Sequence, residues 1–317
     1  MLKGQSANSF NQILVTGGSG FIGHHLINAL SDDPETRISV ISRKDIHLPS
    51  GISLYKGDLR DPIFVNECIM KCKPSTIFHL AANKERSPLF SAFSRGLEDN
   101  LISSLNVFEA ASKLEGLNSI VVLGTAEEYG NNNCPFVEDM REFPVSAYSF
   151  SKVCVTKLCE VVHFLYRMPV VIMRPSLAYG PGQSTDMFLP ALIKSLIGNK
   201  AFPMTAGEQT RDFIYVSDLV DAIIKAAQSE KLIGSVTNVG SGSSVKLKDV
   251  ALKVEQMLGR SGVVQLGALK YRQGEIMEYV VDNSKIKELL GWFPKVSLEE
   301  GLMHTINSFS ETEMGKT

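Results

Sequence analysis

Cysteine is scarce in this sequence, and its pattern excludes two kinds of stabilisation. The 317 residues include five cysteines, an odd number, and no two of them are spaced as a Cys-x-x-Cys pair. A structural zinc site needs about four ligands, whereas Cys68 and Cys72 supply two. We therefore expect reduced thiols in a cytoplasmic protein that holds no metal.

Long apolar runs and clusters of basic residues are also missing. No stretch reaches the roughly 18 apolar residues of a membrane-spanning helix, and the opening MLKGQSANSFNQ has no apolar signal core. The net charge is −2, whereas nucleic-acid binding usually needs a clustered basic surface. We expect no membrane partner, no nucleic-acid partner and a loose tail over residues 1–11.

What the sequence does contain is an alternation of short β-rich runs with helical patterns. The β-rich runs are 13–15, 38–41, 53–55, 76–80, 119–123 and 170–173, and helical spacing marks 21–30, 63–72, 100–113, 147–166 and 188–197. This alternation predicts an α/β fold: a doubly wound Rossmann parallel sheet over residues 1–175, followed by a smaller mixed α/β C-terminal substrate domain over 176–317. A strand near 236–239 is expected to return to the main sheet.

A glycine loop joins the first predicted strand to the first predicted helix. Glycines in this setting allow a tight turn and let the backbone approach a pyrophosphate, whose charge meets the helix N-terminus. The pattern predicts dinucleotide binding, although a tight structural turn is the alternative. The predicted cofactor-binding residues are Gly17, Gly18, Ser19, Gly20, Phe21, Ile22 and Gly23.

The end of the second predicted strand bears on the choice of cofactor. NAD-binding folds usually place an acid there for the ribose 2′-hydroxyl, but this strand ends in Ser42, Arg43 and Lys44. A 2′-phosphate would find a hydrogen-bond donor in Ser42 and a planar cation in Arg43. This favours NADP(H), with NAD(H) as the alternative if the cations are only solvated. Asp58 is placed to accept from the adenine amino group, or else caps the turn before Arg60.

Two side chains with complementary chemistry lie four residues apart on a predicted helix. Tyr148 and Lys152 share a helix face, and a nearby ammonium favours ionisation of a phenol. A phenol poised in this way exchanges a proton with a carbonyl or alcohol oxygen. Thr125, just after the fifth predicted strand, would offer a hydroxyl to the same oxygen. We expect Tyr148 and Lys152 to contact the cofactor as well.

Eight features occur in the order seen in extended short-chain dehydrogenases/reductases: TGGSGFIGHHL, GDL, HLAA, Asn100, GTAEEYG, YSFSK, RPSLAYGPG and TRDFIYVSDL. Over roughly residues 12 to 305 the chain resembles this NAD-dependent epimerase/dehydratase family, whose members act mostly on nucleotide sugars. The resemblance implies that Thr125, Tyr148 and Lys152 form the catalytic triad. It also implies that the cofactor is lined by Asp58, Leu59, Leu80, Ala81 and Ala82.

The resemblance further implies a nucleotide-diphosphate sugar as the substrate. Its predicted binding residues are Lys84, Glu127, Arg174, Arg211, Arg272 and Glu275. Arg211, Arg272 and Glu275 match positions that hold the nucleoside diphosphate, which a guanidinium fork suits. Two alternatives stay open: Arg211 forms an ion pair with Asp212, and Lys84 belongs, with Glu85 and Arg86, to a run of solvated loop charges.

The segment after Thr125 separates the reactions of the resembled family. Its 4,6-dehydratases typically have an Asp-Glu pair there, whereas this chain has Ala126 and Glu127. GTAEEYG, SRKDIHLP and YGPGQS resemble GDP-4-keto-6-deoxy-mannose reductases. The implied function is an NAD(P)H-dependent reductase of a nucleotide-linked 4-keto-6-deoxy sugar, with hydride addition at C4 and Tyr148 as proton donor. Leu177, where the family commonly has asparagine, leaves the sugar and the base open.

Two other functions remain as alternatives. A nucleotide-sugar 4-epimerase with tightly bound NAD would use the same triad. A non-catalytic dinucleotide-binding regulator would generally have lost the Tyr/Lys pair, which is intact here. The helices over 100–113 and 147–166 resemble those of a dimer interface, so a homodimer is expected, unless Val153, Leu158 and Val162 face the sheet instead.

Overall fold

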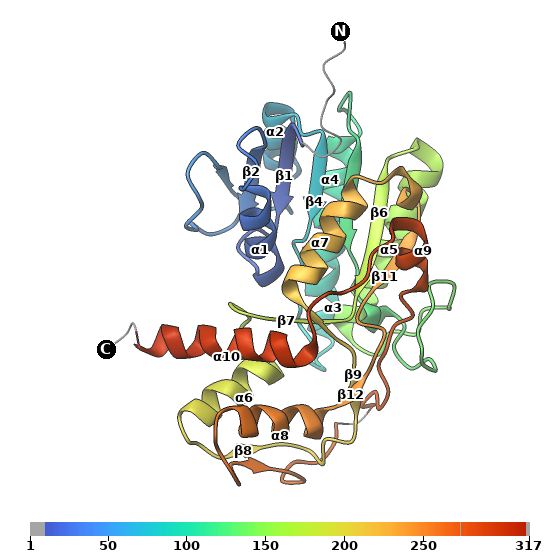
Figure 1. Cartoon of the computed structure of the whole chain (residues 1–317). Coiled ribbons are helices and arrows are strands. Elements are labelled where there is room, and N and C mark those ends of the chain that lie inside the picture. The colour runs from blue at the N-terminus through green and yellow to red at the C-terminus, as the bar shows by residue number, and fades with distance from the viewer. Residues whose placement is uncertain (1–9, 273, 315–317) are drawn as a thin grey trace. The chain divides into compact units, whose positions relative to one another are not determined.

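The computed structural model describes residues 10–272 and 274–314, which form two units (Figure 1). The first unit comprises the described residues of Met1–Glu128, Pro144–Arg174 and Val220–Thr237. The second comprises those of Tyr129–Phe143, Pro175–Leu219 and Asn238–Thr317. The expected boundary after Pro175 lies one residue from an observed one. A single boundary is wrong, however, because 129–143 belongs to the second unit and 220–237 to the first.

The first unit holds most of the strands and helices that the sequence pattern predicts. Its strands are β1 (Gln12–Thr16), β2 (Arg37–Ser42), β3 (Ser53–Lys56), β4 (Thr76–His79), β5 (Ser119–Leu123) and most of β6 (Val170–Pro175). Its helical segments are α1 (Phe21–Leu30), α2 (Pro62–Cys72), α3 (Ser91–Gly96), η1 (Leu97–Ile102), α4 (Ser103–Ala111), η2 (Ala126–Glu128), α5 (Ala147–Tyr166) and η3 (Glu230–Leu232). Helix α7 (Val216–Ala227) and strand β11 (Val236–Val239) each cross a unit boundary.

One seven-stranded sheet organises this unit, with the order β11-β6-β5-β4-β1-β2-β3. Strands β1 to β6 pair in parallel, and β11 lies beside β6, so the predicted return of a strand near 236–239 is confirmed. The chain runs from β1 outward to β3 and then crosses back to β4 on the other side of β1. In such sheets ligands bind where the order reverses, outside the carboxyl ends of the strands. Those ends of β1 and β4 therefore mark the place to look for a site.

The sheet is buried because its strands are rich in β-branched residues. Every residue of β5 (SIVVL) is buried, as expected for a parallel strand covered on both faces. The core on one face joins the sheet to α2, α4 and α5 through residues such as Val65, Val107 and Val155. In Figure 1, α1 and α7 lie on the viewer's side of the strands. None of the helices in the described ranges is both long and apolar enough to cross a membrane.

The predicted helix over 100–113 is the end of a longer helical run that begins at Ser91. Between α3 and α4, η1 has the wider π-helical turn, a feature often found at functional sites. Buried Asn100 in η1 accepts from the Asn83 amide at 2.7 Å and donates to Ser151 of α5 at 2.8 Å. Apolar periodicity does not reveal such a turn, because the turn is held by hydrogen bonds to distant residues.

The second unit has a separate core built mainly on helices. Its elements are β7 (Leu177–Tyr179), α6 (Phe188–Ile197), β8 (Phe202–Pro203), β9 (Thr210–Arg211), β10 (Phe213–Tyr215), β12 (Val245–Lys246), α8 (Leu247–Met257), β13 (Val264–Gln265), α9 (Ser284–Leu290) and α10 (Leu298–Met314). Apolar side chains of α6, α8 and α10 pack together, among them Leu192, Val254 and Leu302. The strands form three two-stranded ladders, so the predicted mixed α/β region is observed.

Two smaller predictions concern cysteine and the N-terminal tail. All five cysteines are free, and burial raises the pKa of the Cys68 thiol to about 11 and that of Cys72 to about 12. Of the predicted tail, residues 1–9 lie outside the described residues. Phe10 is described and packs edge-on against Phe78 of β4, with their ring centroids 5.9 Å apart.

Candidate active site

The glycine loop lies between β1 and α1, as predicted. Gly17 has φ of +74°, and a Cβ on it would lie 2.6 Å from the Ala81 nitrogen, so only glycine fits. A Cβ on Gly23 would lie 2.3 Å from the Gly17 carbonyl oxygen, which explains how α1 packs so closely on the turn. The loop is thus held against the residues that follow β4.

The N-terminus of α1 is open to a ligand. Its N-cap is Gly20, which provides no side-chain cap, and the first turn of α1 contains no acidic residue. Ser19 and Gly20 are exposed. The first amides of a helix carry partial positive charge and need acceptors. A pyrophosphate would supply those acceptors here without repulsion from a carboxylate.

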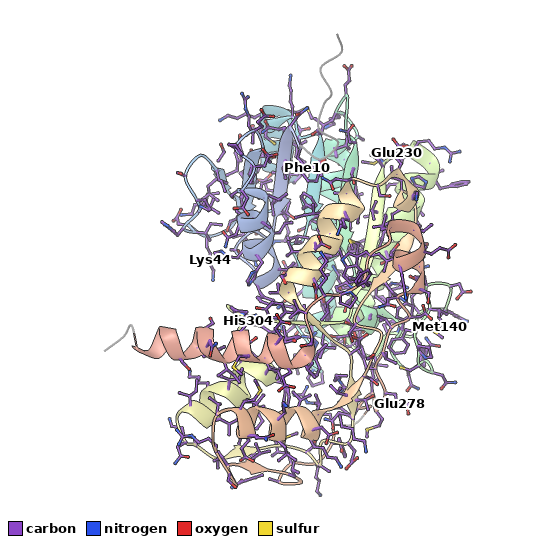
Figure 2. The ribbon with its side chains drawn as sticks, in the orientation of Figure 1. Phe10, Lys44, Met140, Glu230, Glu278 and His304 are labelled. Carbon is purple, nitrogen blue, oxygen red and sulfur yellow. The ribbon has the colours of Figure 1, made fainter. Side chains whose placement is uncertain are left out.

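The residues after β2 and β3 place cations and one carboxylate near each other. Arg43 and Lys44 are exposed, and Lys44 is labelled in Figure 2. The hydroxyl of buried Ser42 accepts from the Lys44 amide at 3.2 Å. Asp58 accepts from the Arg60 amide at 2.9 Å and from its guanidinium at 2.7 Å. Bonding to Arg60, aided by the charge of Arg43, holds the pKa of Asp58 below its usual range. The alternative of a turn-capping Asp58 is therefore observed, while contact with adenine stays a prediction.

The end of β4 lies against the end of β1. The Leu80 amide donates to the Thr16 carbonyl at 3.1 Å, and the Ala81 amide lies 3.3 Å from the Thr16 hydroxyl. Next to them, His79 bridges Thr16 at 2.8 Å and Ser104 at 2.9 Å. Burial lowers the pKa of His79 to about 3, so it is a neutral bridge between strand and helix. Exposed Ala82 follows, whereas the predicted cofactor residue Leu59 packs its side chain into the core.

The predicted triad comes together after β5 and at the start of α5. Helix α5 begins with a capping box in which Ser146 and Ser149 satisfy each other's backbone amides. This fixes the first turns of α5, and hence the buried side chains of Tyr148 and Lys152. Hydrogen bonding to the Thr125 hydroxyl acts to lower the pKa of the Tyr148 phenol. The structure therefore brings Tyr148 near Thr125 and carries Lys152 on the same helix, while the catalytic role of these three residues stays a prediction.

The electrostatics of the triad differ from the expectation. The Lys152 ammonium donates to the Leu123 carbonyl, and burial lowers its pKa. Burial raises the pKa of Tyr148, and the carboxylate of Glu127 adds to the rise. The cation that opposes this rise is Arg86. The ammonium that the sequence assigned to the phenol thus serves a strand carbonyl in this structure.

Arg86, in the loop after β4, is a site residue that the predicted list does not contain. Its guanidinium lies 4.7 Å from the centroid of the Tyr148 ring and bonds the Glu127 carboxylate through two nitrogens. Lys84 lies on the same loop, and partial desolvation of its ammonium, together with the charge of Arg86, lowers its pKa. The charge run after HLAA was the signal for Arg86, but charge alone does not distinguish a solvated loop from a site.

Arg174 is not placed to bind a substrate, which corrects the prediction. Its side chain is 0% exposed, as is that of Glu128, and its Nε and Nη2 lie 2.9 and 2.8 Å from one Glu128 oxygen. Glu128 also accepts from the Thr125 amide at 2.9 Å and from Thr156 of α5 at 2.8 Å. The pair therefore ties the Thr125 segment to β6 and α5, so its role is structural.

In the second unit, Arg211 and Glu275 come together. The Arg211 guanidinium bonds the Glu275 carboxylate and also donates to the Ile276 carbonyl at 2.8 Å. The alternative pair of Arg211 with Asp212 is not formed among the described residues, since Asp212 accepts instead from Ser241 at 2.6 Å. Arg272 is exposed, and its carbonyl accepts from the Glu275 amide at 3.1 Å. Whether these residues hold a diphosphate stays a prediction.

The first unit fits a dinucleotide by two observations. Gly17 and Gly23 leave no room for side chains, so the backbone is the lining, and the first amides of α1, which have no side-chain cap, are available to an anion. Among the described residues there is no cluster of three or more metal-ligating side chains.

Comparison with known proteins agrees with this geometry. The model of the NAD dependent epimerase/dehydratase family matches residues 13–240. The chain belongs to this family. It is thus a member of an NAD-dependent enzyme family, as the order of its motifs predicted.

Similar proteins match over nearly their whole length. An uncharacterized UDP-glucose epimerase, YtcB of Bacillus subtilis (strain 168), is 30% identical over 96% of this chain and 100% of its own. The UDP-N-acetyl-alpha-D-glucosaminuronate decarboxylase of Bacillus cytotoxicus is 31% identical, covering 95% of this chain and 98% of its own. The UDP-glucuronic acid 4-epimerase of Bacillus cereus, solved with UDP-glucuronic acid and NAD, has a TM-score of 0.87 at 28% identity, covering 95% and 99%.

Two glycines of the loop predict opposite results when replaced by alanine. In Gly20→Ala the added Cβ meets only the Gly17 carbonyl, at 3.2 Å, and the backbone is extended, so we expect the free energy of unfolding to change by less than about 1 kcal/mol. The methyl would stand where a pyrophosphate approaches, so NAD affinity should fall about tenfold or more. Gly17→Ala, at φ of +74°, should cost at least about 1–2 kcal/mol of stability. Calorimetry and chemical denaturation measure the two effects; Gly20→Ala with unchanged NAD affinity contradicts the assignment.

Removing Arg174 leaves a buried carboxylate without its cation. We expect Arg174→Met to lower the free energy of unfolding by about 3–5 kcal/mol. Glu160→Gln is the matched control, because it breaks an exposed ion pair with Lys157 on α5 and should cost under about 0.5 kcal/mol. Urea denaturation of both variants makes the comparison, and equal losses would show that the buried pair carries no special weight.

Proposed function

We propose that this chain exchanges a hydride and a proton at C4 of a nucleotide-linked sugar. The observation that supports this most directly is the buried Tyr148 phenol near the buried Thr125 hydroxyl, in the same unit as the open N-terminus of α1. A phenol and a hydroxyl that lie close together are suited to hold the oxygen of an alcohol or ketone. The similar proteins, whose names refer to UDP-linked sugars, support a nucleotide sugar as the source of that oxygen.

The residues have separable roles in this proposal. Tyr148 takes the proton of the C4 hydroxyl on oxidation and returns it on reduction. Thr125 donates a hydrogen bond that fixes the same oxygen, and Lys152 helps to hold the cofactor ribose. The nicotinamide supplies the hydride acceptor and donor. In the second unit, Arg211 and Arg272 would bind the diphosphate, with Glu275 orienting Arg211.

Between a 4-epimerase and a reductase, the similar proteins favour the 4-epimerase, whose reaction is redox-neutral. They include a UDP-glucuronic acid 4-epimerase in complex with NAD and a UDP-glucose epimerase. Epimerisation needs oxidation and reduction at one carbon, which a single Tyr148 serves in both directions. Elimination of water needs a further acid, and buried Ala126 stands where the resembled dehydratases carry one.

The reductase is retained as a second candidate because of one feature. The two residues directly after β2 are the exposed cations Arg43 and Lys44, where an NAD-binding fold usually has a carboxylate, which suits NADPH as a dissociable reductant. Nicotinamide absorbance separates the two outcomes. An epimerase changes the sugar with no net absorbance change, whereas the reductase consumes one NADPH for each 4-keto sugar nucleotide. Parallel titrations with NADH and NADPH test the preference for the 2′-phosphate.

Replacing the proposed proton carrier predicts a loss of turnover without loss of the cofactor. Tyr148→Phe should lower kcat by at least about 100-fold, because general acid–base catalysis at C4 is removed, while NAD affinity stays nearly unchanged. Tyr166→Phe is the control, since Tyr166 is 69% exposed at the end of the same helix. NMR follows the conversion of the sugar nucleotide by each variant. If Tyr148→Phe kept near-full turnover, the assignment of the proton carrier would be wrong.

We also propose that the chain forms a homodimer. Val162 is buried in the core and Leu158 packs against it, so these two residues face inward, as the alternative reading of the sequence expected. Other apolar residues of the same helical segments are exposed, including Ile102 at 41%, Leu105 at 43% and Val161 at 51%. An exposed apolar face of this kind is typical of an interface.

A charge on this face should dissociate the dimer. Leu105→Glu on α4 is expected to yield monomers, because it would bury an unpaired carboxylate. Leu252→Glu on α8 is matched to it, since Leu252 is also 43% exposed, and should leave the assembly unchanged. Sedimentation velocity gives the masses; a monomeric wild-type protein would refute the proposal.

A further inference from the structure

The loop after β4 places a positive charge directly against the ring of Tyr148. The Arg86 guanidinium carbon lies 4.7 Å from the ring centroid, within the range of a cation–π contact. The guanidinium is held there from its other side, since its Nε lies 3.2 Å and its Nη2 2.5 Å from the two oxygens of Glu127. A planar fork held at two points keeps its orientation better than a single flexible ammonium.

Charged groups reach Tyr148 from two segments besides its own helix. Arg86 comes from the β4 loop, whereas Glu127 and Glu128 come from η2. The Glu128 carboxylate is already bound to Arg174, so its charge is balanced. On α5 itself, Lys152 points to the Leu123 carbonyl. The fifth charged group is Lys84 on the β4 loop, which acts on Arg86 and Glu127.

The effect of this arrangement depends on the charge state of the phenol. A phenolate ring is more electron-rich than a phenol ring, so a cation against its face favours the ionised form. The Glu127 carboxylate acts in the opposite direction, and burial does so as well. Arg86 and Glu127 are also partly open, with side chains 35% and 26% exposed, so neither is merely a core ion pair.

We propose that Arg86 is a positioning residue, clamped by Glu127, whose charge against the Tyr148 ring sets the pH range in which Tyr148 transfers its proton. The proposal rests on the proposed role of Tyr148 as proton carrier. It assigns to Arg86 a task that the sequence had given to Lys152. It also explains why a run of charges stands beside the catalytic tyrosine.

The test measures ionisation of Tyr148 directly in the full-length protein with NAD added. A fluorinated tyrosine at position 148 is intrinsically more acidic, and 19F NMR follows that residue alone. In Arg86→Gln its pKa should rise by about one pH unit, and in Glu127→Gln it should fall. Arg86→Lys should shift it less than Arg86→Gln does. Arg95→Gln is the matched control, because it removes another loop-facing cation, which pairs with Glu85 at 3.6 Å, and it should leave the pKa unchanged.

Turnover provides the second readout. Alcohol oxidation needs the ionised phenol, so kcat rises with pH up to the phenol pKa. In Arg86→Gln the rising limb should move to higher pH, with kcat about tenfold lower at pH 7, KM little changed and activity regained in alkali. An unmoved 19F titration in Arg86→Gln, or shifts of the same sign in Arg86→Gln and Glu127→Gln, would overturn the proposal. Because this titration needs no turnover, it decides the matter even if the proposed C4 chemistry is wrong.

Discussion

The positions of the proposed catalytic residues depend on the buried carboxylate of Glu128. It accepts from the amide of Thr125, from Thr156 on α5 and from the guanidinium of Arg174 at the end of β6. A charge removed from water is stable only if such partners surround it completely. Satisfying Glu128 therefore requires that the β5 loop, helix α5 and strand β6 meet at one point. Thr125 and Tyr148 hold their mutual geometry because they are carried by the first two of these.

The glycine loop, where we expect the cofactor, follows a different constraint, which is close approach of two backbone segments. Gly17 touches the chain after β4, and the neutral bridge of His79 joins that chain to β1 and α4. Side chains are excluded there so that amides are the available groups. The surroundings of Tyr148 instead contain several charged side chains, and one of them, the Arg86 guanidinium, lies against its ring. At the carboxyl ends of the strands, backbone groups thus line the glycine loop, whereas charged side chains surround Tyr148.

The sequence was sufficient for those parts that depend on local patterns. The strand and helix alternation, the glycine loop and the four-residue spacing of Tyr148 and Lys152 are all short-range features. It failed for Arg174, which is paired with a residue 46 positions away. The residues next to an arginine in the sequence do not indicate whether its partner is a phosphate or a buried glutamate. Arg86 was missed for the same reason. A run of charged residues in a sequence does not show that one of them contacts an aromatic ring that is distant in the chain.

The division into units has a consequence for how the chain could be taken apart. The backbone passes from one unit to the other after residues 128, 143, 174, 219 and 237. A fragment that stops near residue 175 would keep the glycine loop and the triad but would lose β11, which lies beside β6 at the end of the sheet order. Strand β6 would then become an open edge, ready to pair with another copy. No single cut yields a self-sufficient nucleotide-binding half, so truncation invites aggregation where a modular arrangement would have tolerated it.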